Sequence, residues 1–496
     1  MPKRFMTSIA AWMFIFIPGR AAMVKAASLL MPRGKEVSVH LTLGRPGIRI
    51  SPDFSGLSFE MKDVLPGRDG RHLFSVRNKP VITLFRTLGI GCLRVGGNTA
   101  DLADVPLPAT ADIRSLFNFA RAAHVHVIYT LRLRGPLHPR RAARTAAYIM
   151  HRFADLLTGF ALGNEPNLYD RRFSVYQRIW RTYESAVIKA SPAARFTGPG
   201  STGSGRWAVD FLHAFGTDRH VCMLTQHTYV GGSAWKVKTP AAGRGFLLSS
   251  AIDKQYRRFN RDFGRLAMQH HIPFRMEETN SYYNGGAANV SDTFASALWG
   301  LDYMWWWAAH GARGLNFHTG NWVAAGPHLT RCRYAAFWTT RQGLNVHPLG
   351  YAMEAFNQAG HGRYIPIHIA AAFHKYLRVY GALAHDGSIF VTLINRSHGN
   401  NVRDARVTLS APHQWMGARE MMLIAPDSSV AAKTGITLGG AAFKPDGTWS
   451  GRWSRLPLTA SHQLAPVRVP AAAAIILELN PAPGRVAAQR LTRPAP

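Results

Sequence analysis

Acidic residues are scarce in this sequence: 27 Asp and Glu stand against 59 Lys and Arg, which leaves a formal net charge of +32 over 496 residues. A surplus of this size favours polyanionic partners such as nucleic acid, acidic glycans or an anionic membrane face. However, no block of five or more Lys or Arg occurs, and we find no nucleic-acid-binding motif. We therefore attribute most of the charge to arginine spread along the chain, expect no nucleic-acid partner, and expect the charge to favour an acidic substrate.

Cysteine is also rare. Cys92, Cys222 and Cys332 are far apart, odd in number and without the spacing of metal ligands. This count excludes a disulfide framework. Because Cys92 and Cys222 fall in apolar strand-like runs, we expect them to be buried thiols.

The apolar run near the N-terminus is short. It covers residues 9–17, fewer than the ~20 residues that a membrane-spanning helix needs. Lys3 and Arg4 precede it, and residues 24–26 can serve as a cleavage site, which is typical of a signal peptide over residues 1–27. We therefore expect a secreted or periplasmic protein with no membrane span in the mature chain. An uncleaved N-terminal anchor is the alternative.

Apolar residues, in contrast, are plentiful. The chain is 47% hydrophobic and 17% charged, which suits a folded protein with a sizeable core. Between residues 56 and 320, short apolar runs alternate with helical stretches in the βα rhythm of a parallel sheet. Eight candidate strands lie at residues 56–60, 92–97, 126–132, 159–164, 194–198, 223–229, 273–279 and 314–318. Because eight parallel strands close a barrel, we predict an α/β fold with a (β/α)₈ TIM barrel over residues 51–355.

The rest of the chain indicates a second domain, because 496 residues exceed the ~250 typical of one barrel. After the barrel, short apolar runs alternate with turn residues, which predicts a C-terminal all-β sandwich at residues 356–482. Strand-like runs at 37–43 and 47–50 precede the barrel. We expect this N-terminal segment, residues 28–50, to add strands to the sandwich. Residues 483–496, rich in Pro, Ala and Arg, are predicted to be a flexible tail.

Polar residues gather at the C-terminal ends of the predicted barrel strands. They are Glu60, Asn98, Asn164, Glu165, His227, Tyr229, Glu278 and His318. Barrel enzymes carry their chemistry on this rim, because the loops there converge on one pocket. Ordinary loop polarity explains any single polar end, but many aligned ends indicate a common site.

The fourth strand end carries Gly163-Asn164-Glu165-Pro166 after an apolar run. Pro166 stops the strand because it cannot donate to a ladder, and Glu165 is then aimed into the rim pocket. A carboxyl group in this place can protonate the leaving oxygen of a glycoside, while Asn164 hydrogen-bonds a neighbouring sugar hydroxyl. The alternative is a loop Glu that caps a helix.

Two neighbouring acids, Glu277 and Glu278, follow the seventh strand start. A retaining glycosidase needs a second carboxylate about 5–5.5 Å from the first, on the opposite face of the anomeric carbon. Strand alternation predicts that only one of the two acids points into the pocket. Periodicity alone does not choose between them.

These segments together resemble glycoside hydrolase family 79, which contains heparanase and the β-glucuronidases. The resemblance lies in residues 162–167, 278–287 and 291–295, and it extends to residues 56–60, 93–98 and 348–351. The family's nucleophile is the Glu of a Glu-Thr-x-Ser segment that Tyr and glycines follow. The resemblance therefore implies Glu278 as the nucleophile and Glu165 as the acid/base, on a barrel with a β-rich C-terminal domain.

The resemblance also implies the sugar. Family members recognise a β-linked glucuronic acid, whose carboxylate is held by backbone N–H groups of a Gly-rich turn and by a tyrosine hydroxyl. By position, these groups are Asn284, Gly285 and Tyr351, with Tyr283 beside them. Asn284 departs from heparanase, which carries Gly there, but a backbone contact tolerates the change. Without the resemblance, the alternative for this segment is an ordinary turn.

Other residues follow from the same resemblance. Glu60 and Asn98 match positions that line the far hydroxyls of the sugar, and Asn164 is expected to contact the 2-hydroxyl. Tyr229 is a candidate to hydrogen-bond the nucleophile and hold its charge. For His227, a substrate contact and a structural histidine are both open.

The expected reaction is a double displacement that requires no metal or organic cofactor. Glu278 attacks the anomeric carbon while Glu165 protonates the leaving oxygen, and water then hydrolyses the glucuronyl-enzyme. Arg94 is expected to steady carboxylates of the barrel rather than bind substrate. The carbohydrate partner is thus a glucuronide cleaved by exo action. The alternatives are an endo-acting hydrolase of anionic polysaccharide, a neutral-sugar β-glycosidase and a non-catalytic glycan-binding barrel.

Overall fold

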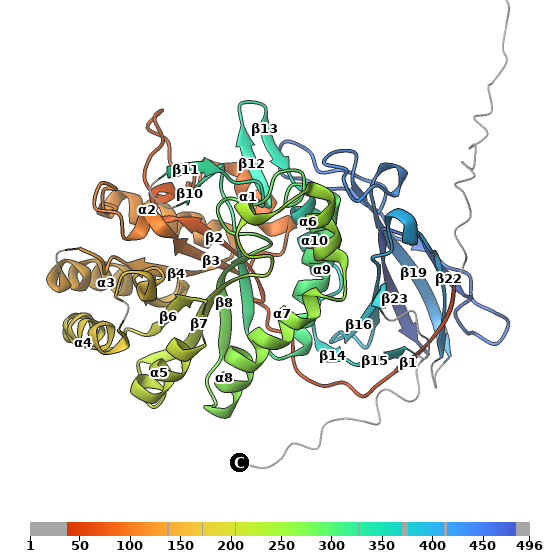
Figure 1. The fold of residues 1–496 in the computed structure, drawn as a ribbon, viewed down its shortest axis with the longest axis horizontal. Coiled ribbons are helices and arrows are strands. Elements are labelled where there is room, and N and C mark those ends of the chain that lie inside the picture. The colour runs from red at the N-terminus through yellow and green to blue at the C-terminus, as the bar shows by residue number, and fades with distance from the viewer. Residues whose placement is uncertain are drawn as a thin grey trace, which may run out of the picture.

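A computed structural model describes residues 37–135, 138–170, 172–203, 205–325, 328–369, 375–410 and 414–482 (Figure 1). The expected signal peptide at residues 1–27, the segment 28–36 and the expected tail at 483–496 lie outside these residues.

The first domain is a closed parallel barrel, as predicted from the eight apolar runs. Its strands are β2 (Ser55–Glu60), β3 (Cys92–Gly96), β4 (His126–Leu131), β5 (Leu157–Leu162), β6 (Phe196–Thr202), β7 (Val221–Tyr229), β8 (Phe274–Asn280) and β9 (Gly314–His318). Each strand pairs with its neighbours along the chain, and β9 pairs with β2 to close the ring. Because all strands run in parallel, their C-terminal ends meet at one rim.

Helices cover the outside of the barrel (Figure 1). They are α1 (Lys79–Thr87), α2 (Thr110–Ala123), α3 (Pro139–Phe153), α4 (Phe173–Ala190), α5 (Arg206–Phe215), α6 (Pro240–Leu248), α7 (Ile252–Phe259), α8 (Arg265–Gln269), α9 (Phe294–Ala309) and α10 (Pro348–Asn357). A π-helical stretch, Asn260–Gly264, joins α7 to α8.

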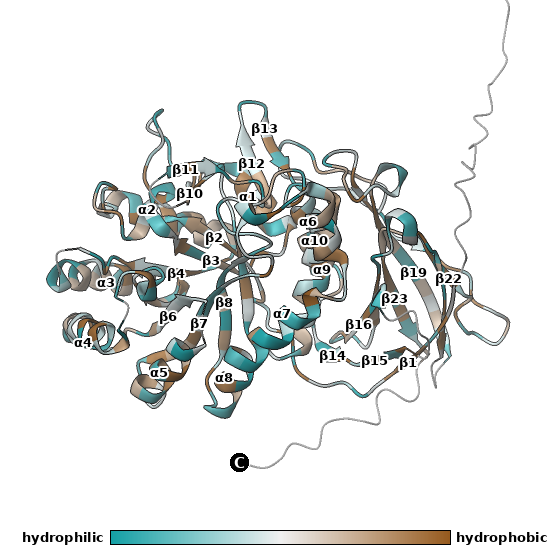
Figure 2. Cartoon of the chain, in the orientation of Figure 1, coloured by the Kyte–Doolittle hydropathy of each residue, from teal (hydrophilic) through white to brown (hydrophobic). Residues whose placement is uncertain are grey.

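Helix α3 shows where the surplus of arginine goes. Ala142, Ala146, Ile149 and Phe153 recur at helical spacing and are buried, whereas Arg144 lies on the opposite, exposed face. In Figure 2, α7 and α8 likewise carry large hydrophilic stretches at the edge of the molecule. Arginines on the exposed faces of different helices lie apart from one another. This agrees with positive charge distributed over the surface rather than concentrated in one basic block.

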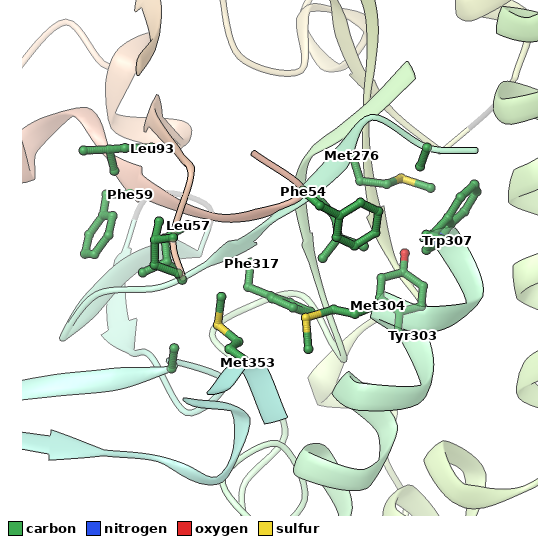
Figure 3. Close-up of a cluster of buried hydrophobic side chains, with 14 of the residues drawn as sticks. Phe54, Leu57, Phe59, Leu93, Met276, Tyr303, Met304, Trp307, Phe317 and Met353 are labelled. Carbon is green, nitrogen blue, oxygen red and sulfur yellow. The ribbon is translucent and has the colours of Figure 1, made fainter. Parts of the chain in front are cut away.

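Helix α9 differs, because it is buried almost all round and lies between the barrel and the C-terminal domain (Figures 1 and 2). Figure 3 shows its Tyr303, Met304 and Trp307 beside Phe317 of β9 and Met276 of β8. The Trp residues of this helix therefore serve packing, as their place in an apolar run indicated.

A buried charge network joins α9 to the C-terminal domain. Asp302 accepts a hydrogen bond from the Tyr380 hydroxyl at 2.7 Å and pairs with Arg396 at 3.2 Å. Trp305 stacks on Tyr380 with ring centroids 5.8 Å apart. The two domains are thus packed closely, with a shared core rather than a linker between them.

The C-terminal domain is a sandwich of two sheets. One sheet has the order β15 (Ile367–Ile369), β1 (Val37–Leu43), β18 (Ala405–Ser410) and β22 (Val467–Val469). The other has the order β14 (Arg363–Ile365), β16 (Leu377–Leu383), β17 (Ile389–Asn395), β23 (Ala473–Pro481), β19 (Trp415–Ile424) and β20 (Thr437–Leu438), and β21 (Ser454–Arg455) also pairs with β19. Apolar side chains such as Leu41, Val391 and Val407 form the core between the sheets.

The N-terminal strand β1 pairs antiparallel with β15 and parallel with β18. The run at 47–50, which we expected to be a strand, makes only a single bridge from Arg49 to Arg363. Pro46 precedes it and Gly47 opens it, so the run is too short to extend a ladder.

Two further hairpins cover one side of the barrel rim. They are β10 (Trp322–Ala325) with β11 (His328–Arg331), and β12 (Phe337–Thr340) with β13 (Gly343–Val346). Among the described residues, none of the helices combines the length and the apolar character needed to span a membrane.

Glu354 of α10 provides a test of the packing. Burial raises the pKa of its carboxyl to about 8, although Gln358 and Asn357 donate hydrogen bonds to it. The same carboxyl titrates near ~4.3 in an unfolded chain. The free energy of unfolding therefore falls as the pH rises from this value toward the higher pKa of the folded state. We expect Glu354→Gln to gain a few degrees of Tm relative to wild type between pH 5 and pH 8, measured by calorimetry. A difference in Tm that stays constant over this range would contradict the assignment.

Candidate active site

The inward-facing side chains of the barrel are largely polar. They include Ser58, Arg94, Thr130, Thr197, Thr225, His227, Arg275, Glu277, Asn316 and His318, all at most 3% exposed. A buried charge is costly unless it is paired, so these groups must satisfy one another. They form the floor under the carboxylates at the rim.

Glu165 lies just beyond the end of β5. Gly163 and Glu165 both adopt the left-handed region, with φ of 76° and 48°, and the Glu165 N–H donates to the Gly200 carbonyl at 3.0 Å. A left-handed conformation before Pro166 is strained, because a residue preceding proline favours extended backbone. This turn directs the Glu165 side chain toward His227, and the side chain remains 12% exposed.

Asn164 beside it is held on both sides. Its N–H donates to Asp101 at 2.6 Å, and its side-chain oxygen accepts from Arg94 at 2.8 Å. Its amide nitrogen donates to Asn98 at 3.1 Å, and the Asn98 amide in turn donates to the Ala324 carbonyl. Asn98 and Asn164 therefore lie together at the rim, as expected.

Glu278 lies near the end of β8 with a side chain only 8% exposed. One carboxylate oxygen accepts from Arg94 at 2.6 Å, and the other accepts from the Tyr229 hydroxyl at 2.9 Å. The expected contact of Tyr229 with Glu278 is thus present. Arg94 binds the Glu278 carboxylate directly, as expected of a residue that steadies carboxylates of the barrel.

The electrostatics keep Glu278 ionised. Burial by itself raises the pKa of this carboxyl, but the cationic His318, His227 and Arg94, together with the Tyr229 hydroxyl, lower the pKa to about 2. A low pKa favours the charged form that a nucleophile needs at neutral pH.

His227 bridges two carboxyl groups. Its Nδ1 lies 3.1 Å from Glu165 Oε1, and its Nε2 lies 3.4 Å from Glu277 Oε1. Burial by itself lowers the pKa of the imidazole, but Glu278, Glu165 and Glu277 raise the pKa to about 9. The histidine is fully buried, so its contacts are with protein groups.

At Glu277 and Glu278, strand β8 departs from the regular pattern in which successive side chains point to opposite faces. Gln226 pairs with Met276 and His227 pairs with Glu278, so Glu277 is an extra residue in the strand. The pairing of β8 with β9 shifts at the same place. This is a β-bulge, which turns neighbouring side chains to one face. Both acids therefore reach the barrel interior, Glu278 near the rim and Glu277 fully buried against His227. That only one of them points into the rim pocket stays a prediction.

The two candidate catalytic acids face each other. Ligand atoms of Glu165, His227 and Glu278 all lie within 4.8 Å of one another. Three such groups are close enough to surround a metal ion, but both Glu278 oxygens already accept hydrogen bonds, and Arg94 would repel a cation there. The arrangement suits a pair of carboxyl groups on either side of a sugar ring better than a metal centre.

Glu60 is close to this group but fully engaged. Its oxygens accept from the Thr99 N–H at 2.9 Å, the Thr99 hydroxyl at 2.7 Å and the Ala324 N–H at 2.8 Å. His318 lies 3.7 Å from both Glu60 and Glu278. The structure thus places Glu60 in support of the β10–β11 hairpin and of His318.

The turn that follows β8 lies close to Glu278 and Tyr229. The ring of Tyr283 is 6.1 Å from that of Tyr229 and is 43% exposed. Asn284 and Gly285 have φ of 66° and 79°, and the Gly285 carbonyl accepts from Arg333. Among the described residues, no hydrogen-bond partner is found for the N–H groups of Asn284 and Gly285. Free N–H groups at positive φ suit an anion.

Tyr351 does not join the group. Its ring packs on Phe443 and its hydroxyl accepts from the Phe443 N–H at 3.3 Å, because it lies on α10 facing the C-terminal domain. The tyrosine that reaches the site is Tyr334, whose ring lies 5.9 Å from Tyr229 and 6.1 Å from His318. No strand end or motif marks Tyr334 in the sequence, since it follows the β10–β11 hairpin.

An open cavity of about 1020 Å³ lies beside the ends of β2 and β9. Its lining includes Lys62, Arg71 and Arg77, and a continuing hollow adds Arg331 and Arg341. Asp63 and Asp69 also line this cavity, so basic groups outnumber acidic ones there without excluding them, and neither Glu165 nor Glu278 is part of its lining.

Comparisons with known proteins were made by sequence and by fold. No protein-family model matches the chain. A β-glucuronidase of Aspergillus niger is 25% identical over 195 residues, which cover 33% of this chain and 35% of that protein. A β-glucuronidase of Neurospora crassa is 25% identical over 134 residues, which cover 24% of this chain and 20% of that protein. The matches thus span about a third or less of the length of these curated relatives.

Solved structures share the whole fold. A 4-O-α-L-rhamnosyl-β-D-glucuronidase from Fusarium oxysporum gives a TM-score of 0.69 at 17% identity, over 89% of this chain and all of that one. A family 51 arabinofuranosidase from Xanthomonas axonopodis pv. citri gives 0.64 at 15% identity, over 90% of this chain and all of that one. The predicted barrel with a C-terminal β-domain is confirmed. The predicted resemblance to β-glucuronidases is also confirmed.

Proposed function

We propose that this protein is a retaining glycoside hydrolase that cleaves β-linked glucuronic acid by exo action. The observation that carries the proposal is the closeness of Glu165 and Glu278, within 4.8 Å of each other across His227. Retaining enzymes hold their carboxyl groups about 5–5.5 Å apart, whereas inverting enzymes need about 6.5–9.5 Å to admit a water molecule. This upper bound on the distance between one oxygen of each carboxyl group supports the first class.

The groups around the pair fit two successive displacements. Glu278 attacks the anomeric carbon as an ionised carboxylate, while Glu165 donates its proton to the departing oxygen. Formation of the ester removes the charge on Glu278, to which Arg94 and Tyr229 had donated. In the second step Glu165 accepts a proton from water, which attacks the anomeric carbon and releases Glu278.

A glucuronide is favoured by the turn after β8. The free N–H groups of Asn284 and Gly285 offer charge-assisted hydrogen bonds to a sugar carboxylate. Tyr283 and Tyr334 lie next to Tyr229, so hydroxyl groups are at hand on the same side of the nucleophile. The two curated relatives named β-glucuronidase support the same substrate class. We also propose that the protein is exported, on the basis of its N-terminal apolar run.

A second candidate is endo cleavage of an anionic polysaccharide. The basic cavity lined by Lys62, Arg71 and Arg77 favours it, because a chain that extends past the cleaved bond would meet these cations. Cleavage inside such a polymer, rather than from its end, would distinguish this candidate from exo action.

The catalytic pair is tested by removing each acid. We expect Glu278→Gln to lower kcat on 4-nitrophenyl β-glucuronide by at least about 10³-fold, because no covalent step remains. We expect Glu165→Ala to be slow and partly rescued by azide, an anionic nucleophile that attacks the glucuronyl-enzyme in place of water, needs no base, and releases Glu278 with a glucuronyl azide as product. Product analysis by NMR is expected to show the β-anomer first. An α-anomer as first product would contradict retention.

Tyr229→Phe tests how the charge of Glu278 is held. The variant keeps the ring but loses a hydrogen bond to a charged group, which is worth about 1.5–3 kcal/mol. We expect kcat to fall about 10- to 100-fold. The acid limb of the plot of kcat/KM against pH is expected to move to higher pH, because loss of the Tyr229 hydroxyl raises the pKa of the Glu278 carboxyl. Tyr351→Phe, whose hydroxyl meets Phe443 instead, is the matched control and is expected to leave the profile in place.

The sugar is tested with a panel of 4-nitrophenyl β-glycosides. We expect the glucuronide to exceed the glucoside, galactoside and xyloside in kcat/KM by at least about 10²-fold, since charge-assisted hydrogen bonds to the carboxylate contribute several kcal/mol. Activity on neutral sugars alone would reject the glucuronide while leaving the glycosidase intact.

A further inference from the structure

One buried acid has no role in the reaction described above. Glu277 is fully buried, and the β-bulge turns it toward the barrel axis below His227. Its Oε1 lies 3.4 Å from His227 Nε2, and its Oε2 has no hydrogen-bond partner within the described part of the chain. Gly200 makes room for it, because a Cβ at that position would lie 2.5 Å from Glu277 Oε1.

A purely structural reason for this acid is weak. Burying an ionised carboxylate costs several kcal/mol, and replacing a buried charge by an apolar side chain is often neutral or stabilising. A carboxylate with one oxygen left unpartnered is costlier still. His227 lowers the pKa of this carboxyl most, and Arg94 and Thr225 lower it further, so the effect of Glu277 is sought first at His227.

A carboxylate at one ring nitrogen decides what the other nitrogen does. With Glu277 as acceptor, Nε2 carries a proton in every protonation state of His227. Nδ1 can then donate a hydrogen bond to Glu165 or accept one from it, at a distance of 3.1 Å. A cationic ring donates to the Glu165 carboxylate, and a neutral ring accepts from the Glu165 carboxyl. Both forms of the acid/base thus find a partner without a flip of the ring.

The surrounding charges agree with this arrangement. The imidazole is faced by Glu165 from the β5 end, by Glu277 and Glu278 from β8, and by Arg94 from β3. His318 on β9 faces Glu278 and Glu60. Glu60, Glu277 and Glu278, whose pKa values are all lowered, balance the cations Arg94, His227 and His318. When Glu165 carries its proton, loss of Glu277 would leave this buried set with one excess positive charge.

We propose that Glu277 is a positioning residue that fixes the tautomer and charge of His227 and thereby the proton transfer by Glu165. The proposal rests on the proposed function only in so far as Glu165 is the acid/base. It concerns the effect of one carboxylate on its neighbour, so it holds for any glycoside that the protein cleaves.

The first test uses Glu277→Gln, which keeps the shape and removes the charge. Proton donation matters most for poor leaving groups, so we expect kcat/KM on phenyl β-glucuronide to fall at least about tenfold and that on 2,4-dinitrophenyl β-glucuronide to fall less than about threefold. Loss of an anion lowers the pKa of His227, so the alkaline limb of the profile is expected to move to lower pH.

The matched control is Glu354→Gln, a buried carboxyl on α10 remote from the barrel interior. It is expected to preserve both the leaving-group dependence and the pH profile. Equal losses of Glu277→Gln on all leaving groups, with an unmoved alkaline limb, would overturn the proposal.

A second test does not depend on turnover and needs only a His227→Asn variant that folds as the wild type does. Wild-type protein labelled with ¹⁵N-histidine contains 22 histidines, and His227→Asn identifies the signals of His227 by their loss. We expect a protonated Nε2 throughout pH 6–9, and a ring that remains cationic at pH 7.5. A neutral ring with a bare Nε2 would overturn the proposal. Absence of wild-type turnover on every glucuronide, with this signature present, would instead reject the substrate and retain the role of Glu277.

Discussion

The ion pair between Arg94 and Glu278 is the interaction on which the rest of the site depends. Removing a carboxylate from water costs several kcal/mol, and a lone buried acid responds by taking up a proton. Together with His318 and His227, Arg94 prevents this at the end of β8, where Ser58 and Asn164 also anchor its guanidinium. The same guanidinium ties the ends of β3, β5 and β8 together, so the contact that holds Glu278 beside the turn of Asn164 and Glu165 also helps to keep Glu278 ionised.

The barrel interior holds many buried polar and charged side chains, and buried charges are costly unless opposite charges balance them. The β-bulge on β8 achieves this by presenting two adjacent acids to one interior, where regular alternation would present one. Gly200 accommodates the additional acid, and His227 links it to Glu165. Local backbone irregularity thus supplies a countercharge that a regular strand could not deliver.

Much of the fold could be predicted because it is recorded in local patterns. Each barrel strand is an apolar run, and Glu165 and Glu278 stand at strand ends within recognisable segments. The site residues that escaped prediction depend on long-range contacts. Tyr334 reaches Tyr229 because the β10–β11 hairpin folds over the rim. Tyr351 lies on α10 and packs against Phe443 instead of entering the site. Glu277 escaped because a bulge breaks the period on which strand prediction relies.

The position of β1 has a consequence for biosynthesis. Val37 lies next to Ala405 in the finished sheet, and the whole barrel is encoded between them. At roughly 5–20 residues per second, the ribosome needs about 20–70 s to produce the partner strand. During that time β1 has an unpaired edge, which is a template for aggregation. A chaperone or an export factor that holds this segment would protect the nascent chain until its last strands emerge.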